Sequence, residues 1–122
     1  MKKKTTAQLR KELWRIFTLF IKERDKWKCF TCGREAVGRG MNSGHYKPKG
    51  ACGADAYFSE INVNAQCTFC NLVLQGNQVE YRKRLIKKYG EKKIQELERT
   101  FRDTNKDFPY EERIKHYKTL LG

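Results

Sequence analysis

The sequence contains no apolar run long enough to cross a membrane as a helix. Its first residues, Met1 to Thr6, carry positive charge but are not followed by the hydrophobic segment of a secretory signal. We therefore expect a cytoplasmic protein without membrane contact. Hydrophobic residues make up only 39% of the 122 residues, which is little material for a large core. This composition favours one small domain strengthened by a metal, because structural zinc contributes on the order of 10 kcal/mol of folding free energy.

Acidic residues are also scarce. The 14 Asp and Glu residues are outnumbered by 27 Lys and Arg residues, so the formal net charge is +13. The excess is +7 in residues 1–28, +1 in residues 29–70 and +5 in residues 71–122. Two basic arms around a nearly neutral centre are typical of a protein that binds the phosphates of nucleic acid. A generic solubilising charge is the alternative interpretation.

Five cysteines are present, and four of them form two Cys-x-x-Cys pairs, Cys29 with Cys32 and Cys67 with Cys70. In a reducing compartment this spacing indicates metal binding more often than a disulfide or a redox pair. Four thiolates complete the tetrahedral shell of one zinc ion, so we expect a structural site with no open position. The fifth cysteine, Cys52, lies in a glycine-rich loop and is either a free thiol or an additional ligand.

Helical periodicity surrounds this cysteine module. Apolar residues recur at helical spacing over residues 5–24, and Thr5 with Gln8 has the form of a capping box. Five glycines and one proline predict turns and short strands over residues 38–56. Strands are predicted near 42–46 and 57–62, and they pair as a hairpin. A helix is predicted after Cys70, with Asn77 and Glu80 as start signals and Gly90 as its end. It is followed by a helix over about 91–102, a polar linker over 103–107 and a helix that begins at Pro109.

These elements predict an α+β fold, a small zinc-stabilised treble-clef core with flanking α-helices. The 34 residues between Cys32 and Cys67 are enough for a hairpin that brings the second cysteine pair back to the first. We divide the chain into a basic N-terminal helix (1–28), a zinc-knuckle core (29–90) and a C-terminal helical extension (91–122), all within one compact domain.

One of the two histidines, His45, lies between the cysteine pairs, Asn62 precedes the second pair, and Asn71 directly follows it. A histidine near its unperturbed pKa can act as a general base at neutral pH and take a proton from water attacking a phosphodiester. An asparagine oxygen can coordinate a hard cation, and the amide can also hold a loop. We predict His45 as the base, Asn71 as a ligand of catalytic Mg²⁺ or Mn²⁺, and Asn62 as a loop organiser. Taken alone, His45 could also be a histidine in a surface loop, or a zinc ligand that replaces one of the cysteines.

Basic and aromatic residues near these positions are expected to contact DNA phosphates. They are Tyr46, Lys47, Lys49, Arg82, Lys83, Arg84, Lys87 and Lys88. A solvated helix face is the alternative for the run that begins at Arg82. We favour backbone contact because Tyr81, Leu85 and Tyr89 already provide the buried face of that helix. Such contacts fix the position of the DNA without reading its sequence.

The trio of His45, Asn62 and Asn71 resembles the His-Asn-His (HNH, or ββα-metal) endonuclease motif in a His-Asn-Asn form. From about Leu13 to Glu98 the chain is also similar to the phage NinG/Rap recombination proteins. The segments that carry this resemblance are Trp14-Arg15-Ile16-Phe17, Thr31-Cys32-Gly33, Gly44-His45-Tyr46, Asn62-Val63-Asn64-Ala65-Gln66-Cys67, Cys70-Asn71, Gly76-Asn77 and Tyr81-Arg82. The resemblance implies a structure-specific DNA endonuclease that cuts branched intermediates, such as Holliday junctions and D-loops, in the host cytoplasm. Paired cuts of this kind would suit a homodimer.

The sequence departs from the HNH motif at one position. Many HNH enzymes carry an aspartate directly before the histidine, where it binds the catalytic metal, but here that position is Gly44. The ion would then need Asn71 and a further oxygen donor, for which the candidates are Asp55, Glu60, Gln75 and Asn77.

The rival hypothesis is a non-catalytic, zinc-finger-like module that binds nucleic acid. Charge and zinc support both functions equally, and only His45 with the two asparagines favours catalysis. A third hypothesis, a zinc module for protein interaction, explains the basic flanks poorly.

Overall fold

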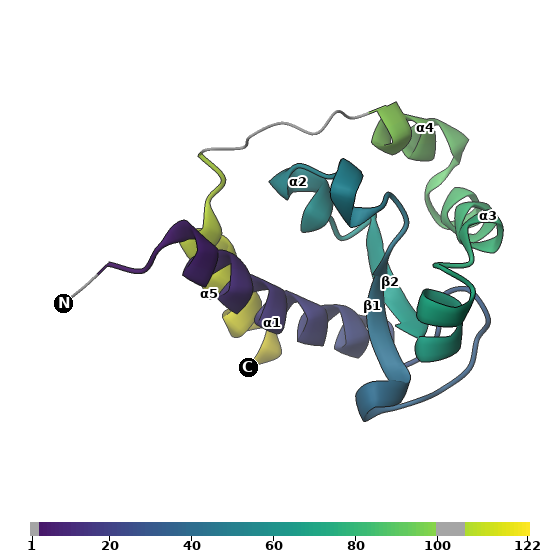
Figure 1. Ribbon diagram of the computed structural model, residues 1–122, viewed down its shortest axis with the longest axis horizontal. Coiled ribbons are helices and arrows are strands. Elements are labelled where there is room, and N and C mark those ends of the chain that lie inside the picture. Colours follow the sequence, from purple (N-terminus) through teal and green to yellow (C-terminus); the bar gives the residue numbers. More distant parts are fainter. Residues whose placement is uncertain (1–2, 100–106) are drawn as a thin grey trace.

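The chain folds into helices around one two-stranded sheet, in a computed structural model that describes residues 3–99 and 107–122 (Figure 1). The elements in order are α1 (Thr6–Arg24), the 3-10 turn η1 (Gly38–Gly40), β1 (Met41–His45), the 3-10 turn η2 (Lys49–Ala51), α2 (Ala54–Tyr57), β2 (Val63–Cys67), the π-helical turn η3 (Phe69–Val73), α3 (Gln78–Tyr89), α4 (Glu91–Arg99) and α5 (Tyr110–Leu121). No helix within residues 3–99 and 107–122 has both the length and the apolar character needed to span a membrane.

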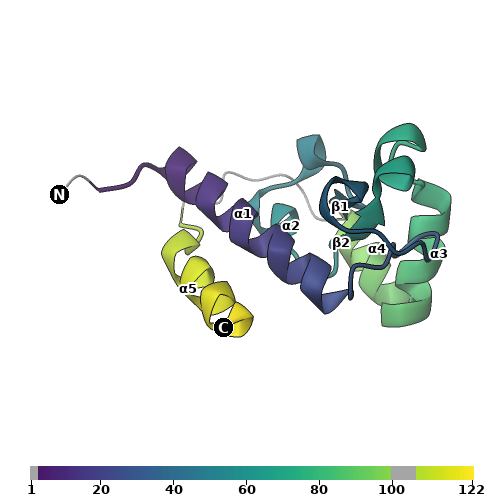
Figure 2. The same ribbon diagram turned by 90° about the horizontal axis from the view of Figure 1, so that it is seen from below.

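The helix predicted over residues 5–24 is confirmed as α1. Thr5 is its N-cap, and the predicted capping box forms, since the backbone N–H groups of Thr5 and Gln8 each donate to the other residue's side chain. Helix α5 lies along α1 at one end of the molecule, while α3 and α4 lie at the other end (Figures 1 and 2). Aromatic rings fill the seam between α1 and α5, with the centroids of Phe17 and Tyr117 5.2 Å apart. The first and last predicted segments of the chain therefore share one core, and the division into three segments stays a prediction.

The predicted hairpin exists, but its second strand was misplaced. Strands β1 and β2 pair antiparallel, with Met41 opposite Cys67 and His45 opposite Val63. The strand predicted near 57–62 is wrong, because residues 54–57 form helix α2 and the chain then turns before β2. The hydroxyl of Ser59 accepts from the backbone N–H of Asn62, and its carbonyl accepts from Val63 N–H. This turn delays the strand until Val63, so β2 leads directly into the second cysteine pair.

An ion pair at the end of α1 holds the hairpin in place. The Arg24 guanidinium is 2.8 Å from the Asp25 carboxylate. Arg24 also donates to the carbonyl of Val63 and the side-chain oxygen of Asn64, and Asp25 accepts from the backbone N–H of Ala65. Since all three of these partners are in β2, the C-terminal end of α1 fixes the position of the strand that carries Cys67.

The helix predicted after the second cysteine pair is α3, and Asn77, one of its predicted start signals, is its N-cap. The π-helical turn η3 follows Thr68, and Gln75 and Asn77 then adopt positive φ angles of 51° and 49°. Helix α3 starts only at Gln78 and ends at Gly90, as the sequence predicts. The helix predicted over 91–102 is present as α4 up to Arg99, and its remainder lies outside the described residues, as does most of the predicted linker. The final helix has Pro109 as its N-cap, in agreement with the prediction.

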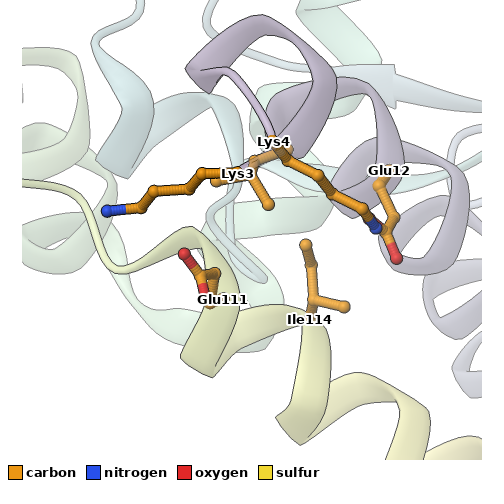
Figure 3. Close-up of a pocket in the computed structure, with 6 residues that line it drawn as sticks. Lys3, Lys4, Glu12, Glu111 and Ile114 are labelled. Carbon is orange, nitrogen blue, oxygen red and sulfur yellow. The ribbon is translucent and has the colours of Figure 1, made fainter. Parts of the chain in front are cut away.

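A hollow of about 340 Å³ lies between the start of α1 and helix α5 (Figure 3). Its labelled side chains are Lys3, Lys4, Glu12, Glu111 and Ile114, and Lys4 extends toward Glu12 to form an ion pair of 2.7 Å. Lys4 and Glu12 belong to the same segment at the start of α1, and Lys118 of α5 is 3.5 Å from the same Glu12 carboxylate. The hollow is therefore a seam of surface ion pairs between α1 and α5.

Candidate functional site

The four cysteines of the two pairs gather into one cluster. Their sulfur atoms all lie within 4.8 Å of one another, so Cys29, Cys32, Cys67 and Cys70 could hold one structural zinc ion. Gly33 makes the first knuckle possible, because its φ of 81° lets the chain reverse while its N–H donates to the Cys29 carbonyl.

Burial raises the pKa of Cys32 to about 12 and also raises the pKa of Cys70, whereas local hydrogen bonds favour a thiolate at Cys29. Burial raises the pKa of Cys29, but hydrogen bonds from the Thr31 hydroxyl and nearby backbone amides outweigh burial and lower that pKa to about 6. The backbone N–H of Cys70 donates to the sulfur of Cys67, 3.4 Å away. Cys52 lies outside the cluster, where its thiol is buried and donates to the carbonyl of Lys47.

His45 is the last residue of β1 and is held tightly between aromatic rings. Its ring stacks on Trp14 of α1 at 5.3 Å and 18°, and the Tyr57 ring centroid is 4.7 Å away. Trp14 therefore packs against the candidate base. The Nε2 atom lies 2.9 Å from the carbonyl oxygen of Tyr57. Because a carbonyl only accepts hydrogen bonds, the proton of the neutral ring is on Nε2 and the lone pair is on Nδ1.

The environment of His45 keeps its ring neutral. Its side chain is 8% exposed, and Nδ1 is buried with no hydrogen-bond partner among the described residues. The pKa of His45 is lowered from 6.5 to about 4, chiefly by burial. The Tyr57 hydrogen bond opposes this shift, and the positive charge of Lys49 adds a smaller contribution in the same direction as burial. A neutral imidazole with a free lone pair is the form that can accept a proton at neutral pH.

Asn62 lies immediately before β2 and bridges the loop that follows His45. Its Oδ1 accepts from the backbone N–H of Lys47 at 2.6 Å. Its Nδ2 donates to the carbonyls of Ala56 at 3.0 Å and Lys47 at 3.3 Å. Both ends of the segment 47–56 are thus tied to one fully buried amide. These contacts suit the predicted role of Asn62, which is to hold this loop in place.

Asn71 and His45 line the same pocket, which has a volume of about 290 Å³. Side chains alternate between the faces of a strand, so Ser43 and His45 project from one face of β1, while Asn71 lies against the other. The pocket therefore opens across the edge of β1 that β2 does not cover. Its lining residues are Ser43, His45, Pro48, Lys49, Asn71, Leu72, Gln75, Gly76 and Gln78, none of them acidic.

Gly44 has no room for a side chain. A Cβ atom at this position would lie 1.9 Å from Oε1 of Gln66 and 3.0 Å from Oδ1 of Asn71. The aspartate of many HNH enzymes could not be accommodated here without moving Gln66. Gln66 itself is fully buried on β2, and its Oε1 has no hydrogen-bond partner among the described residues. We did not identify Gln66 from the sequence, where only its place in a strand opposite Asn42 could have marked it.

The further oxygen donors proposed from the sequence lie in different places. Gln75 lines the pocket with Asn71. Asn77 turns its amide toward the sulfur of Cys70, 3.7 Å away, and Glu60 accepts from the Tyr117 hydroxyl at 3.0 Å. Asp55 is in the first turn of α2. Of these four, the structure brings only Gln75 to the pocket.

The residues expected to contact DNA lie in more than one place. Lys49 lines the His45 pocket, and its amine is 5.6 Å from the Trp14 ring centroid. Arg84, Lys87 and Lys88 line a separate hollow beside Cys29 and Lys28. Lys83 is exposed on α3, and the backbone N–H of Lys47 is bonded to Asn62.

Two of the expected DNA contacts are engaged within the protein. The Tyr46 hydroxyl donates to Glu98 of α4, and the Arg82 guanidinium is 2.9 Å from the same carboxylate. Burial, with Glu98 nearby, raises the pKa of Tyr46 to about 12. Glu98 thereby ties α4 to α3 and to the end of β1. No local sequence pattern indicates this contact, because it joins residues 52 and 16 positions apart.

Fold and site together define a small, basic α+β protein with a candidate four-cysteine metal site beside a histidine pocket. The chain belongs to the family described as bacteriophage lambda NinG protein, whose model matches residues 1–121. It is 34% identical over 89 residues to protein ninG of Escherichia phage lambda and equally to those of Escherichia phage 933W and Salmonella phage P22. Each match covers 72% of this chain and 43% of the relative, so the chain spans less than half the length of these relatives. No solved structure matches it.

Proposed function

We propose that the chain is a metal-dependent, structure-specific DNA endonuclease that acts on branched recombination intermediates such as Holliday junctions and D-loops. The observation that carries this proposal is the pocket at the edge of β1, which is lined by both His45 and Asn71. In this proposal the hairpin, the two cysteine pairs and η3 form a zinc-stabilised treble-clef core of the HNH type. Family membership supports a role in phage recombination.

The chemistry assigns separate tasks to three side chains. Nδ1 of His45 is the ring nitrogen left to accept the proton of the attacking water, and because it is buried, DNA binding must first open it to water. The Nε2–H remains on the Tyr57 carbonyl and keeps the ring oriented. Asn62 holds the loop after His45 against the end of the hairpin. Asn71 provides an amide oxygen for Mg²⁺ or Mn²⁺, which would stabilise the negative charge that builds on the phosphate. Lys49, at the mouth of the pocket, holds the phosphate in position.

The test is cleavage of a labelled four-way junction and a matched linear duplex, with and without Mg²⁺ or Mn²⁺. We expect metal-dependent cutting of the junction, and a loss of roughly 10²- to 10⁴-fold in rate for His45→Ala. The matched control is His116→Ala, which changes the other histidine, exposed on α5. Zinc content and junction affinity should be the same in all three proteins.

The alternative function is a non-catalytic zinc module that binds nucleic acid. The basic composition favours it as much as it favours an enzyme. Tight junction binding without cutting by the wild type, at any divalent ion tested, would establish this alternative. A sedimentation measurement on the protein–junction complex tests the homodimer that paired cuts would require.

A further inference from the structure

We propose that the hollow between α3 and the first cysteine knuckle, here called the basic hollow, is a second DNA-binding site. It holds one arm of a branched DNA molecule while another arm lies at the His45 pocket. Its volume is about 510 Å³, and the basic residues that line it are Lys28, Arg84, Lys87 and Lys88. None of the residues that line the basic hollow also lines the His45 pocket. This inference rests on the proposed function, since it specifies how the same protein distinguishes branched from linear DNA.

Three lysines reach the basic hollow from two different elements. Lys28 directly precedes the knuckle, and its Cε lies 4.0 Å from the position that a Cβ at Gly33 would take. Lys87 and Lys88 are in the last turn of α3, and the amine of Lys88 is 5.8 Å from the Phe30 ring centroid. All three lysines are exposed, and none of them forms an ion pair among the described residues. Residues far apart in the sequence thus present their amines to one hollow.

Carboxylates near the basic hollow do not cancel the charge of these lysines. Within the part of the chain that the structure describes, Asp25 is the one acidic residue that lines the hollow. Its carboxylate is 2.8 Å from the Arg24 guanidinium and also accepts from the backbone N–H of Ala65. Glu80 is paired with Arg84 at 2.9 Å, so this pair contributes little net charge. A hollow lined by lysines without carboxylate partners fits the phosphates of a nucleic acid strand.

The basic hollow and the His45 pocket lie at opposite edges of the hairpin. The pocket lies at the edge of β1 that β2 does not cover. At the outer edge of β2, the backbone N–H of Ala65 donates to Asp25, and its carbonyl accepts from the N–H of Phe30, both at 2.8 Å. Asp25 and Phe30 both line the basic hollow. The two strands of the hairpin therefore separate the two sites.

Helix α3 gives the scale of this separation. Its first residue, Gln78, lines the His45 pocket, while Lys87 and Lys88 in its last turn line the basic hollow. With a rise of 1.5 Å per residue, Gln78 and Lys88 are about 15 Å apart along the helix axis. Duplex DNA is stiff over such a length, since its persistence length is about 150 bp. A straight duplex bound at one edge of the hairpin would not bend around to the other, whereas the arms of a branched molecule diverge.

Occupation of both sites at once would favour branched DNA over linear DNA. When one arm is bound at the His45 pocket, the joined second arm is at a high effective concentration near the basic hollow. A linear duplex lacks this second arm and occupies one site at a time. The basic hollow would therefore contribute to the choice of substrate and not to the hydrolysis itself.

The experiment compares the binding of a four-way junction and of a linear duplex with the same arm length, by fluorescence anisotropy at several salt concentrations. The full chain carries His45→Ala so that the junction stays intact. Lys28→Gln, Lys87→Gln and Lys88→Gln, combined in this chain, should weaken junction binding by about tenfold or more. The slope of log K against log salt should fall by up to about 2.7, which is 0.9 for each lost phosphate contact. Linear duplex should lose at most about twofold in affinity, because the His45 pocket can still hold it.

The matched control removes the same charge from elsewhere on the surface. It combines Lys92→Gln, Lys93→Gln and Lys115→Gln, three exposed lysines that line neither the basic hollow nor the His45 pocket. This control should keep the parent's preference for the junction. Zinc content and thermal unfolding are measured for every variant. They test the other role of lysines beside the cysteine cluster, which is to balance the charge of zinc-bound thiolates. In that role, their replacement would lower zinc content or stability and leave the junction affinity of the folded protein unchanged.

The outcomes separate this inference from the proposed function. If the variant of the basic hollow binds the junction like its parent, or loses the same factor for junction and duplex, the hollow holds no second arm, even when the wild type cuts junctions. A parent protein that binds the junction no more tightly than the duplex overturns the inference as well. If the preference for the junction depends on the three lysines but the wild type cuts no DNA, the second site stands and the hydrolytic function fails.

Discussion

Two polar clusters lie close together in this molecule, and they are built from opposite kinds of donor. The four-cysteine cluster joins four soft, ionisable ligands within 4.8 Å, enough to complete a tetrahedral shell. The cluster around Gly44 offers two hard, neutral amide oxygens and no acidic group. The first arrangement satisfies a metal by itself, so it serves the fold. The second has no charged ligand, and its amides are held by hydrogen bonds within the protein.

The two clusters also depend on each other through the hairpin. Cys67 ends β2, and Gln66 directly precedes it, so the strand that closes the cysteine cluster also aims the Gln66 amide. Asn71 follows Cys70 in the π-helical turn. Zinc binding would therefore hold Gln66 and Asn71 in place without touching either side chain. The Arg24–Asp25 pair adds a third anchor to the same strand.

The largest effect is expected from breaking the cysteine cluster. Cys67→Ala leaves an incomplete zinc shell and removes on the order of 10 kcal/mol of folding free energy, more than a small domain possesses. We expect one zinc per wild-type chain and an unfolded variant, measured by atomic absorption and circular dichroism. Cys52→Ala is the matched control, because this thiol is buried but lies outside the cluster. It should keep its zinc and lose only about 1 kcal/mol.

The pH profile of cleavage should reveal the burial of His45. Since burial lowers the pKa of His45 to about 4, the base stays deprotonated down to that pH. The rate at low substrate should then fall only as pH drops toward 4, whereas an ordinary histidine would lose activity around 6.5. The measurement is kcat/KM for junction cutting between pH 4 and 8, with zinc content followed in the same samples. An acid limb centred near 6.5, with zinc retained, would contradict the buried geometry.

A comparison of the predicted and observed elements shows how much of the fold can be predicted from the sequence alone. The cysteine pairs, the first helix and the first strand depend on local spacing, and the structure contains each of them close to the predicted position. The second strand was misplaced because Tyr57, Phe58 and Ile61 look like strand residues. Their segment forms a helix and a turn instead, where Phe58 packs into the α1–α5 core. Periodicity cannot detect a turn fixed by the hydroxyl of Ser59.

The position of the Gln66 side chain also could not be predicted from the sequence, but for a different reason. It depends on the register that sets Gln66 opposite Asn42, and on a missing Cβ in the neighbouring strand. Both are properties of the paired strands, and neither is encoded in one local segment. Counting charges has the same weakness, since it cannot show that Glu98 neutralises Arg82.

A smaller effect is expected from filling the space at Gly44. Gly44→Ala places a methyl group 1.9 Å from Oε1 of Gln66, and overpacking of this kind costs about 1–3 kcal/mol. Urea unfolding measures the loss, and Gln66→Ala in the same chain should recover most of it. Gly50→Ala is the control, because no atom lies within 4 Å of the added methyl. Equal stability of the Gly44→Ala and Gly50→Ala proteins would mean that the Gln66 side chain moves away easily.

The smallest effects concern the basic residues, and they separate a substrate contact from an internal one. Lys49 lines the pocket, whereas Arg82 is paired with Glu98. For Lys49→Gln we expect the slope of log K against log salt for duplex binding to fall by about 0.9, the change for one lost phosphate contact. Arg82→Gln should leave that slope unchanged and lower stability by at most about 1 kcal/mol, since the pair is largely exposed. Fluorescence anisotropy at several salt concentrations distinguishes the two. A loss of slope for Arg82→Gln but not for Lys49→Gln would show that DNA displaces Glu98 and approaches α3, away from the His45 pocket.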